Sequence, residues 1–101
     1  MSATPAIRAS AIRDLHQAAK WYEAESEGLG EAFVQEVDQA ITAACLMPLR
    51  FPKLHRDIRR SLVKRFPFGV YFRHDAESDE LIVLAIMHLR RAPKRWRVRE
   101  E

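Results

Sequence analysis

Residues 81–87, Leu-Ile-Val-Leu-Ala-Ile-Met, are apolar at every position, and this run constrains the fold more than any other segment. A strand with one buried face alternates apolar and polar side chains, whereas an unbroken apolar run is typical of a strand covered on both faces. Such a strand needs neighbours on its sides and other elements packed on the sheet. We therefore expect residues 81–87 at or near the centre of a sheet.

Two helices are predicted in the first half of the chain. Apolar residues recur at helical spacing over residues 11–22, directly after Ser10, which is a favoured N-cap residue. A second helical stripe covers residues 33–44 and ends at Pro48. Because two glycines interrupt the pattern within residues 28–30, we expect an antiparallel helical hairpin.

The remaining pattern predicts strands. Residues 49–57 combine proline with clustered charge and are expected to form a loop, and residues 75–80 suit a polar hairpin connection. Strands are expected at residues 6–9, 58–64, 70–73 and 81–87. The last three can form an antiparallel meander whose apolar face is covered by the hairpin. The predicted fold is a single α+β domain over residues 1–101, ordered β-α-α-β-β-β, with an antiparallel sheet packed against a helical hairpin in two layers.

Charge is distributed unevenly along the 101 residues. Up to Met47, three basic residues stand against seven acidic ones, which gives −4; from Pro48 onward, 14 basic and seven acidic residues give +7. A basic second half favours an anionic partner, either nucleic acid or an acidic protein surface. An ordinary solvated basic face is the alternative.

Cellular location is indicated by what the sequence lacks. Cys45 is the only cysteine, so no internal disulfide can form, and its apolar helical context favours a packed thiol over a nucleophile. The N-terminus lacks a secretory signal pattern, and no apolar run approaches the roughly 20 residues that span a bilayer. We expect a cytoplasmic protein without membrane association.

Known catalytic motifs are absent, and neither a metal nor a cofactor is expected. There is no glycine-rich phosphate loop, no nucleophile elbow and no cysteine-histidine zinc spacing. RNA cleavage through the 2′-hydroxyl needs a base, positive charge at the phosphate and an acid. The residues that could furnish such a site are Arg59, Arg60, Arg65, His88, Arg90 and Arg91.

Strand periodicity limits how these residues can meet. If the last strand is regular, residues 82, 84, 86 and 88 share one face, so His88 and Arg91 point to opposite faces unless the strand bulges or ends near Leu89. His88 could equally be a structural residue at the end of a core strand. Trp96 could stack a base or anchor the tail against the sheet, whereas a tryptophan at the edge of a helix stripe, such as Trp21, usually packs in the core or at its margin. We expect anchoring for both.

Several motifs, in order and spacing, resemble the RelE/ParE toxin family of type II toxin-antitoxin systems over nearly the whole chain. They are Trp-Tyr-Glu at 21–23, Gly-Leu-Gly at 28–30, Arg-Phe-Pro-Phe at 65–68 and the ending from His88 through Arg91 to Trp96. The resemblance implies a fold related to small microbial ribonucleases. It also implies a cognate antitoxin partner that wraps the toxin, and operator DNA contacted indirectly through the antitoxin.

The resemblance implies two possible targets. ParE-like members inhibit DNA gyrase without catalysis, whereas RelE-like members cut messenger RNA on the ribosome. The first three motifs look like ParE and the related plasmid-stabilisation proteins, and the tail lacks the tyrosine of a RelE-like site, so gyrase inhibition is favoured.

Each hypothesis implies its own site residues. An endoribonuclease would use Arg65, His88 and Arg91 as catalytic residues. The residues expected to face a target are Arg59, Arg60, Arg90, Lys94, Arg95 and Trp96. A third hypothesis is a non-toxic module that binds only its antitoxin.

Overall fold

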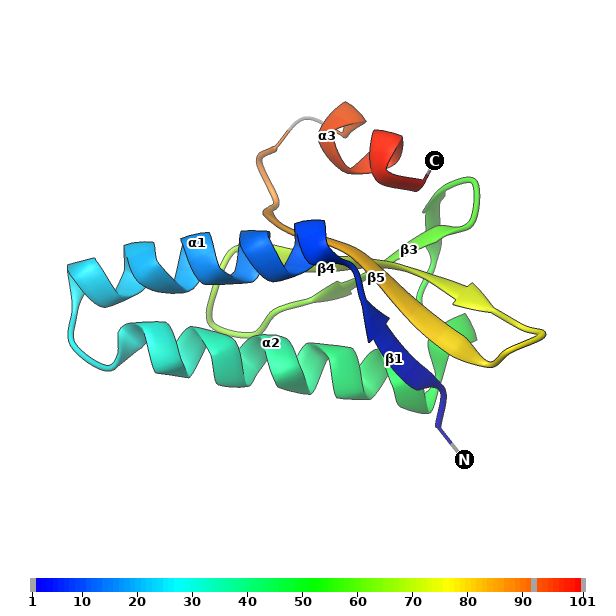
Figure 1. Ribbon diagram of the computed structural model, residues 1–101, viewed down its shortest axis with the longest axis horizontal. Helices are drawn as coiled ribbons and strands as arrows, with labels where there is room; N and C mark the ends of the chain where they lie inside the picture. The colour runs from blue at the N-terminus through cyan, green and yellow to red at the C-terminus, as the bar shows by residue number, and fades with distance from the viewer. Residues whose placement is uncertain (1, 92, 101) are drawn as a thin grey trace.

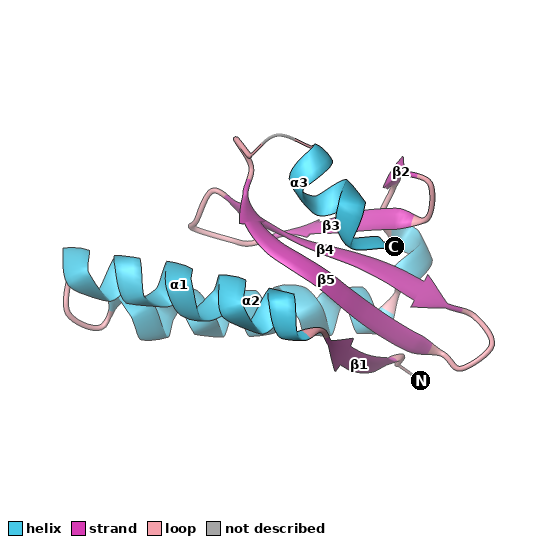
Figure 2. Cartoon of the chain, turned by 45° about the horizontal axis from the view of Figure 1, so that its top comes forward, coloured by secondary structure: helices cyan, strands magenta, loops and turns pink. Residues whose placement is uncertain are grey.

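The computed structural model describes residues 2–91 and 93–100 and has an α+β architecture, as predicted. Helices α1 (Ala9–Glu25) and α2 (Leu29–Leu46) form a hairpin against one face of a five-stranded sheet (Figure 1). The short C-terminal helix α3 (Lys94–Arg97) lies over the other face (Figure 2). This cover on the second face was absent from the two-layer prediction.

The sheet has the order β1-β5-β4-β3-β2. Its strands are β1 (Thr4–Ile7), β2 (Lys53–His55), β3 (Ile58–Leu62), β4 (Phe68–Asp75) and β5 (Glu80–His88). Strands β3, β4 and β5 form the expected antiparallel meander. The expectation of an entirely antiparallel sheet was wrong, because β1 pairs with β5 in parallel, with Thr4 opposite Glu80. The long connection between these two strands permits that direction.

Residues 81–87 are covered on both faces, as their composition predicts; β4 pairs along the whole segment, and β1 flanks its other side as far as Val83. Leu81, Val83 and Ile86 belong to the cluster under the helical hairpin. Leu84 and Met87 belong to the cluster under α3, beside Ile58, Tyr71 and Trp96. The strand therefore joins two apolar layers.

A β-bulge in β5 breaks the regular alternation assumed from the sequence. Tyr71 pairs with Ala85, but the next residue, Phe72, pairs with Val83, so Leu84 is the additional residue. Such a bulge shifts every later side chain to the opposite face. Ile86 and His88 consequently do not share a face with Leu84, contrary to the periodicity argument.

Aromatic side chains dominate the packing beneath the hairpin. Phe33 is fully buried on α2, and its ring lies 5.1 Å from Phe66 and 4.9 Å from Phe68, both in edge-to-face geometry. Tyr22 of α1 contacts the same rings, with its centroid 4.8 Å from that of Phe66. Such pairs contribute about 0.5–1.5 kcal/mol beyond simple burial. The Phe-Pro-Phe motif thus locks the β3–β4 turn beneath the hairpin.

Several element boundaries differ from the predicted ones. Strand β1 ends at Ile7 and α1 begins at Ala9, so Ser10 is not the N-cap; its hydroxyl donates instead to the Leu84 carbonyl, at 3.2 Å. A 3₁₀ turn (Pro48–Arg50) and the edge strand β2 occupy part of the predicted loop. Strand β2 has only two paired positions, which is too short for a periodic pattern.

The turn between α1 and α2 is closed by one carboxylate. Glu23 accepts hydrogen bonds from the backbone N–H groups of Gly28 and Gly30, each at 3.0 Å. These donors belong to the first turn of α2, which has no intrahelical acceptors for them. A Cβ atom on Gly30 would lie 2.6 Å from the Ala19 carbonyl oxygen, so the helices approach too closely there for any side chain.

We predict that Gly30→Ala lowers the free energy of unfolding by about 1–3 kcal/mol, because the added methyl group must push the two helices apart. Urea denaturation followed by circular dichroism measures this change. Gly28→Asn is the matched control: Gly28 has φ 84° with open space around it, and asparagine tolerates that conformation. An equal loss in both variants would contradict the close-packing argument.

Candidate functional site

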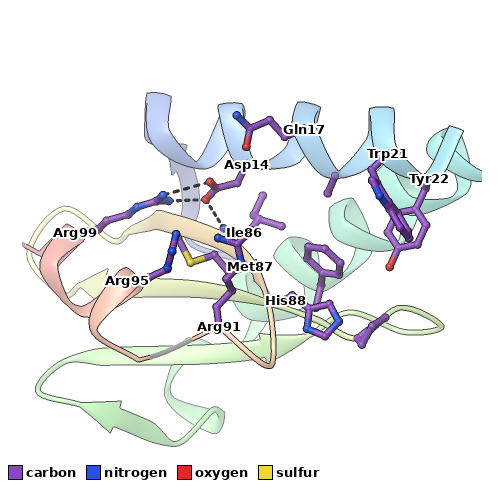
Figure 3. A pocket seen from close by; sticks show the side chains of 13 residues that line it. Asp14, Gln17, Trp21, Tyr22, Ile86, Met87, His88, Arg91, Arg95 and Arg99 are labelled. Atoms are coloured by element: carbon purple, nitrogen blue, oxygen red, sulfur yellow. Dashed lines mark hydrogen bonds and ion pairs between the residues drawn. The ribbon is translucent and has the colours of Figure 1, made fainter. Parts of the chain in front are cut away.

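A cavity of about 730 Å³ opens between α1, the end of β5 and the C-terminal turns (Figure 3). This volume lies within the roughly 300–1,000 Å³ range of small-molecule sites. Helix α1 provides one side, the last residues of β5 lie at the base, and arginines that follow β5 provide the other side.

The α1 side of the cavity ends in an exposed tryptophan. Asp14, Ala18 and Trp21 follow one another at helical spacing and line the cavity together with Gln17. Trp21 is 60% exposed, so the expectation that it packs against the core was wrong. Its ring meets Tyr22 edge-on at 5.1 Å. Burial raises the pKa of Tyr22 above the ordinary value of a tyrosine.

The end of β5 brings His88 and Arg91 into the same cavity. The strand stops at His88, and the chain then turns, with the Arg91 N–H donating to the His88 carbonyl at 3.0 Å. Both side chains consequently line the cavity, as the strand-end alternative allowed. The Arg90 N–H donates to Nδ1 of His88 at 3.1 Å, so a neutral imidazole carries its proton on Nε2.

An ion pair between Asp14 and Arg99 closes one end of the cavity. The Arg99 guanidinium donates to both carboxylate oxygens of Asp14, and Asp14 also accepts the Ile86 N–H at 3.0 Å. The side chains of Arg99 and Asp14 are only 25% and 14% exposed. Arg99 further donates to the Leu84 carbonyl at 3.3 Å. Asp14 is therefore fully engaged within the fold.

The cavity is electropositive. Arg91 and Arg95 are exposed, line it, and form no ion pair with any residue that the structure describes. Asp14 is the one carboxylate among the described lining residues, and Arg99 balances its charge. Two arginine forks beside an imidazole N–H can bind a phosphate or carboxylate group.

Arg65, predicted to join His88 and Arg91 in a catalytic site, is not among the described lining residues of the cavity. It occupies the β3–β4 turn with φ 71°, and its guanidinium lies 5.5 Å from the Phe66 ring centroid. The three residues are thus not assembled around one cavity in this structure.

The residues predicted to face a target divide into two groups. Arg59 donates to the Phe51 carbonyl, and the alkyl chain of Arg60 packs closely against Gly69. Trp96 is 5% exposed and stacks on Tyr71 at 4.7 Å, which confirms that it packs against the sheet. The remaining three, Arg90, Lys94 and Arg95, are exposed on or near α3.

A family model described as the ParE toxin of type II toxin-antitoxin systems, parDE, matches residues 6–93. This chain belongs to the ParE toxin family. The ParE fold is also found among solved structures: a chain of the chromosomal ParDE system from P. aeruginosa superposes with a TM-score of 0.72 at 18% identity, covering 86% of this chain and 96% of that one.

A second solved structure, the RelBE2 toxin-antitoxin complex from Mycobacterium tuberculosis, contains a chain that superposes with a TM-score of 0.62 at 22% identity. It covers 87% of this ParE-family chain and 99% of that chain. No curated protein matches the sequence. Both likenesses show the shared fold.

Two negative findings concern residues 2–91 and 93–100. No group of three or more histidine, cysteine, aspartate or glutamate side chains there could hold a metal ion. No helix in the same ranges has the length and apolar character needed to cross a membrane.

Sequence reasoning missed the contribution of α1 to the cavity. Trp21 was considered only as a core residue and part of a family motif, and Asp14 and Gln17 were not considered as site residues, although the spacing of the three places them on one face of α1. Arg99 was not considered at all. The missing information was tertiary, because only the fold shows that this face of α1 opposes the end of β5.

We predict that Asp14→Asn loosens the C-terminal turns, because asparagine can still accept the Ile86 N–H but offers Arg99 no charge. The amide hydrogens of residues 94–99 should exchange faster, and the free energy of unfolding should fall by about 1–3 kcal/mol. Hydrogen exchange with mass spectrometry and urea denaturation measure these effects.

Asp57→Asn is the control for this prediction. It removes an exposed pair, Lys53–Asp57 at 3.3 Å, with side chains 54% and 69% exposed. Loss of this exposed pair should lower the free energy of unfolding by no more than about 0.5 kcal/mol. Unchanged exchange in residues 94–99 of Asp14→Asn would contradict the role given to the Asp14–Arg99 pair.

Proposed function

We propose that this ParE-family toxin acts in the cytoplasm by binding and inhibiting DNA gyrase, and that a cognate antitoxin neutralises it. The observation that carries the proposal is the family match over residues 6–93. The electropositive cavity lined by Arg91 and Arg95 adds support, because it can bind an anionic group. The fold alone does not separate ParE-like from RelE-like action, so the chemistry of the cavity supplies the further support.

The cavity offers positive charge but no free base among its described lining residues. Cleavage through a 2′-hydroxyl needs a group that accepts a proton. Nδ1 of His88 already accepts the Arg90 N–H, which leaves Nε2 of the neutral ring as a donor. Asp14 is bound by Arg99 and the Ile86 N–H. These arrangements support a toxin that binds its target without cleaving RNA.

Exposed basic residues around α3 are the proposed gyrase-facing surface. Arg90, Lys94 and Arg95 are exposed, while Trp96 holds α3 on the sheet through its stack with Tyr71. Under this proposal Trp96 acts through positioning. A helix already held on the sheet loses less conformational entropy on binding than a mobile segment does.

An endoribonuclease is the second candidate, and one observation favours it. His88 and Arg91 line one cavity, so a proton donor and a phosphate-binding fork lie together. Under this alternative the ribosome and messenger RNA would be the partners, and Arg65 would have to reach the site from the β3–β4 turn.

Purified toxin should inhibit supercoiling of relaxed plasmid by gyrase, and added antitoxin should relieve the inhibition. Arg90→Ala combined with Lys94→Ala should weaken inhibition about tenfold, because exposed charges at the interface are removed. Arg13→Ala combined with Lys20→Ala, which removes the same charge from exposed positions on α1, should have little effect.

Three other outcomes would redirect the assignment. Undisturbed supercoiling together with cleaved transcripts in a translating extract would support the endoribonuclease. Undisturbed supercoiling with intact transcripts would argue against both targets. Normal growth when the toxin is expressed without antitoxin would indicate a non-toxic antitoxin-binding module.

A second groove is the proposed docking site of the antitoxin, which would connect the toxin to operator DNA. It lies between α2 and β3 and is lined mainly by apolar groups, including Ala40, Phe51 and Leu62. Strand β2 pairs with β3 only at Ile58 and Arg59, so the following residues of β3 present an open edge within the described chain. A partner strand or helix can cover such a surface.

Glu36 supports this assignment. Its Oε1 atom is buried in the groove without a hydrogen-bond partner among the described residues. Such an atom favours a partner that brings a donor, because an unpaired buried acceptor is costly.

We predict that Leu62→Glu weakens antitoxin binding by about tenfold or more, since Leu62 is 57% exposed at this groove and its burial by a partner would be lost. Isothermal titration with the antitoxin measures the affinity. Leu49→Glu is the matched control, because Leu49 is 69% exposed and is not a lining residue of the groove. Equal affinities of Leu62→Glu and wild type would place the antitoxin elsewhere.

A further inference from the structure

We propose that the cavity beside α1 binds a short stretch of single-stranded nucleic acid, with a base stacked on Trp21 and a backbone phosphate held by Arg91 and Arg95. This inference goes beyond gyrase inhibition and does not depend on it. It rests on the chemistry that the cavity brings together: an exposed indole, two guanidinium groups that form no ion pair with the described residues, and a histidine N–H donor.

The aromatic end of the cavity is built as a stacking platform. Trp21 is 60% exposed although it is the largest apolar side chain on α1, and Tyr22 supports it edge-on at 5.1 Å with an interplanar angle of 83°. In Figure 3 the indole projects from α1 beside Tyr22, at the opposite end of the lining residues from Arg99. A supported ring with a free face is suited to base stacking, and every base offers a matching face.

The cationic end is held in place by two separate contacts. Trp96 stacks on Tyr71 and fixes α3, which carries Arg95, while the Asp14–Arg99 pair ties the next turn to α1. Arg91 follows directly from the turn that ends β5. The Nε2–H of a neutral His88 adds a donor at the base of the cavity. Guanidinium forks bind phosphate through paired hydrogen bonds.

The length of the cavity suits a chain of linked nucleotides. Asp14 and Trp21, which both line the cavity, are seven residues apart on α1, so its α1 side extends over about 10 Å at 1.5 Å per residue. A free phosphate or a single base could occupy only one end. A short single strand can occupy both.

An acidic peptide is the competing ligand. Its carboxylates could pair with Arg91 and Arg95, but it would leave the exposed indole of Trp21 without a matching group unless an aromatic residue happened to follow. Nucleic acid alternates a planar ring system with a negative charge in every repeat, which the cavity matches at both ends. The combination therefore favours nucleic acid.

The test is binding of a fluorescently labelled ten-residue oligothymidylate to the full-length toxin, measured by anisotropy at low salt. Unlabelled oligothymidylate should also quench the intrinsic fluorescence, because Trp21 is exposed and Trp96 is buried. Trp21→Ala should weaken binding about tenfold or more, and Trp21→Phe should retain part of the affinity.

Removing the two arginines should change the dependence on salt. The slope of log affinity against log salt should fall by about 0.7 for each phosphate that Arg91→Ala or Arg95→Ala leaves without its guanidinium. Arg13→Ala is the matched control, since it removes the same charge from an exposed position on α1 that is not among the lining residues. Its slope and affinity should equal those of the wild type.

Two results would overturn the proposal. The first is an affinity that is unchanged in Trp21→Ala, or that falls equally in Arg13→Ala, since either shows nonspecific attraction to a basic protein. The second is displacement of the probe by oligoglutamate as readily as by oligothymidylate, which would assign the cavity to acidic peptides. Gyrase is absent from these experiments, so failure of the gyrase proposal would not affect their outcome.

Discussion

The contacts of the Asp14 carboxylate hold together the elements that form the cavity of this toxin. Strand β1 covers the edge of β5 only as far as Val83, and beyond that point α1 takes over, with Asp14 accepting the Ile86 N–H. The same carboxylate binds Arg99 and thereby holds the C-terminal turns. One side chain therefore joins the first helix, the most buried strand and the end of the chain, and the cavity lies where these three meet.

The bulge at Leu84 determines what the cavity contains. Without it, regular alternation would turn His88 away from the helical hairpin, and Phe68 would face a different partner. With it, His88 lies opposite Phe68, at a ring distance of 5.4 Å, on the side that carries α1. A single additional residue in β5 thus converts a histidine at a strand end into part of an electropositive site.

The sequence supports the fold better than it supports the site. Apolar periodicity predicts α1, α2 and the buried strand β5, because each pattern is long enough to separate helix from strand. It does not predict β2, which has too few residues, or the bulge, which depends on pairing with β4. The sequence likewise identified His88 and Arg91, which are neighbours in the chain, as candidate site residues. It did not identify Trp21 or Arg99 as part of the site, because residues so distant in sequence meet only through tertiary packing.

The parallel pairing of β1 with β5 also has a consequence for the order of events during synthesis. Thr4 is among the first residues made, yet its partner Glu80 emerges only after both helices and the other three strands. Until then β1 has no strand to pair with, and α1 lacks β5, the strand against which it packs. Contacts this distant in sequence form late in folding. The newly made chain therefore remains without its cavity until almost all of it has left the ribosome.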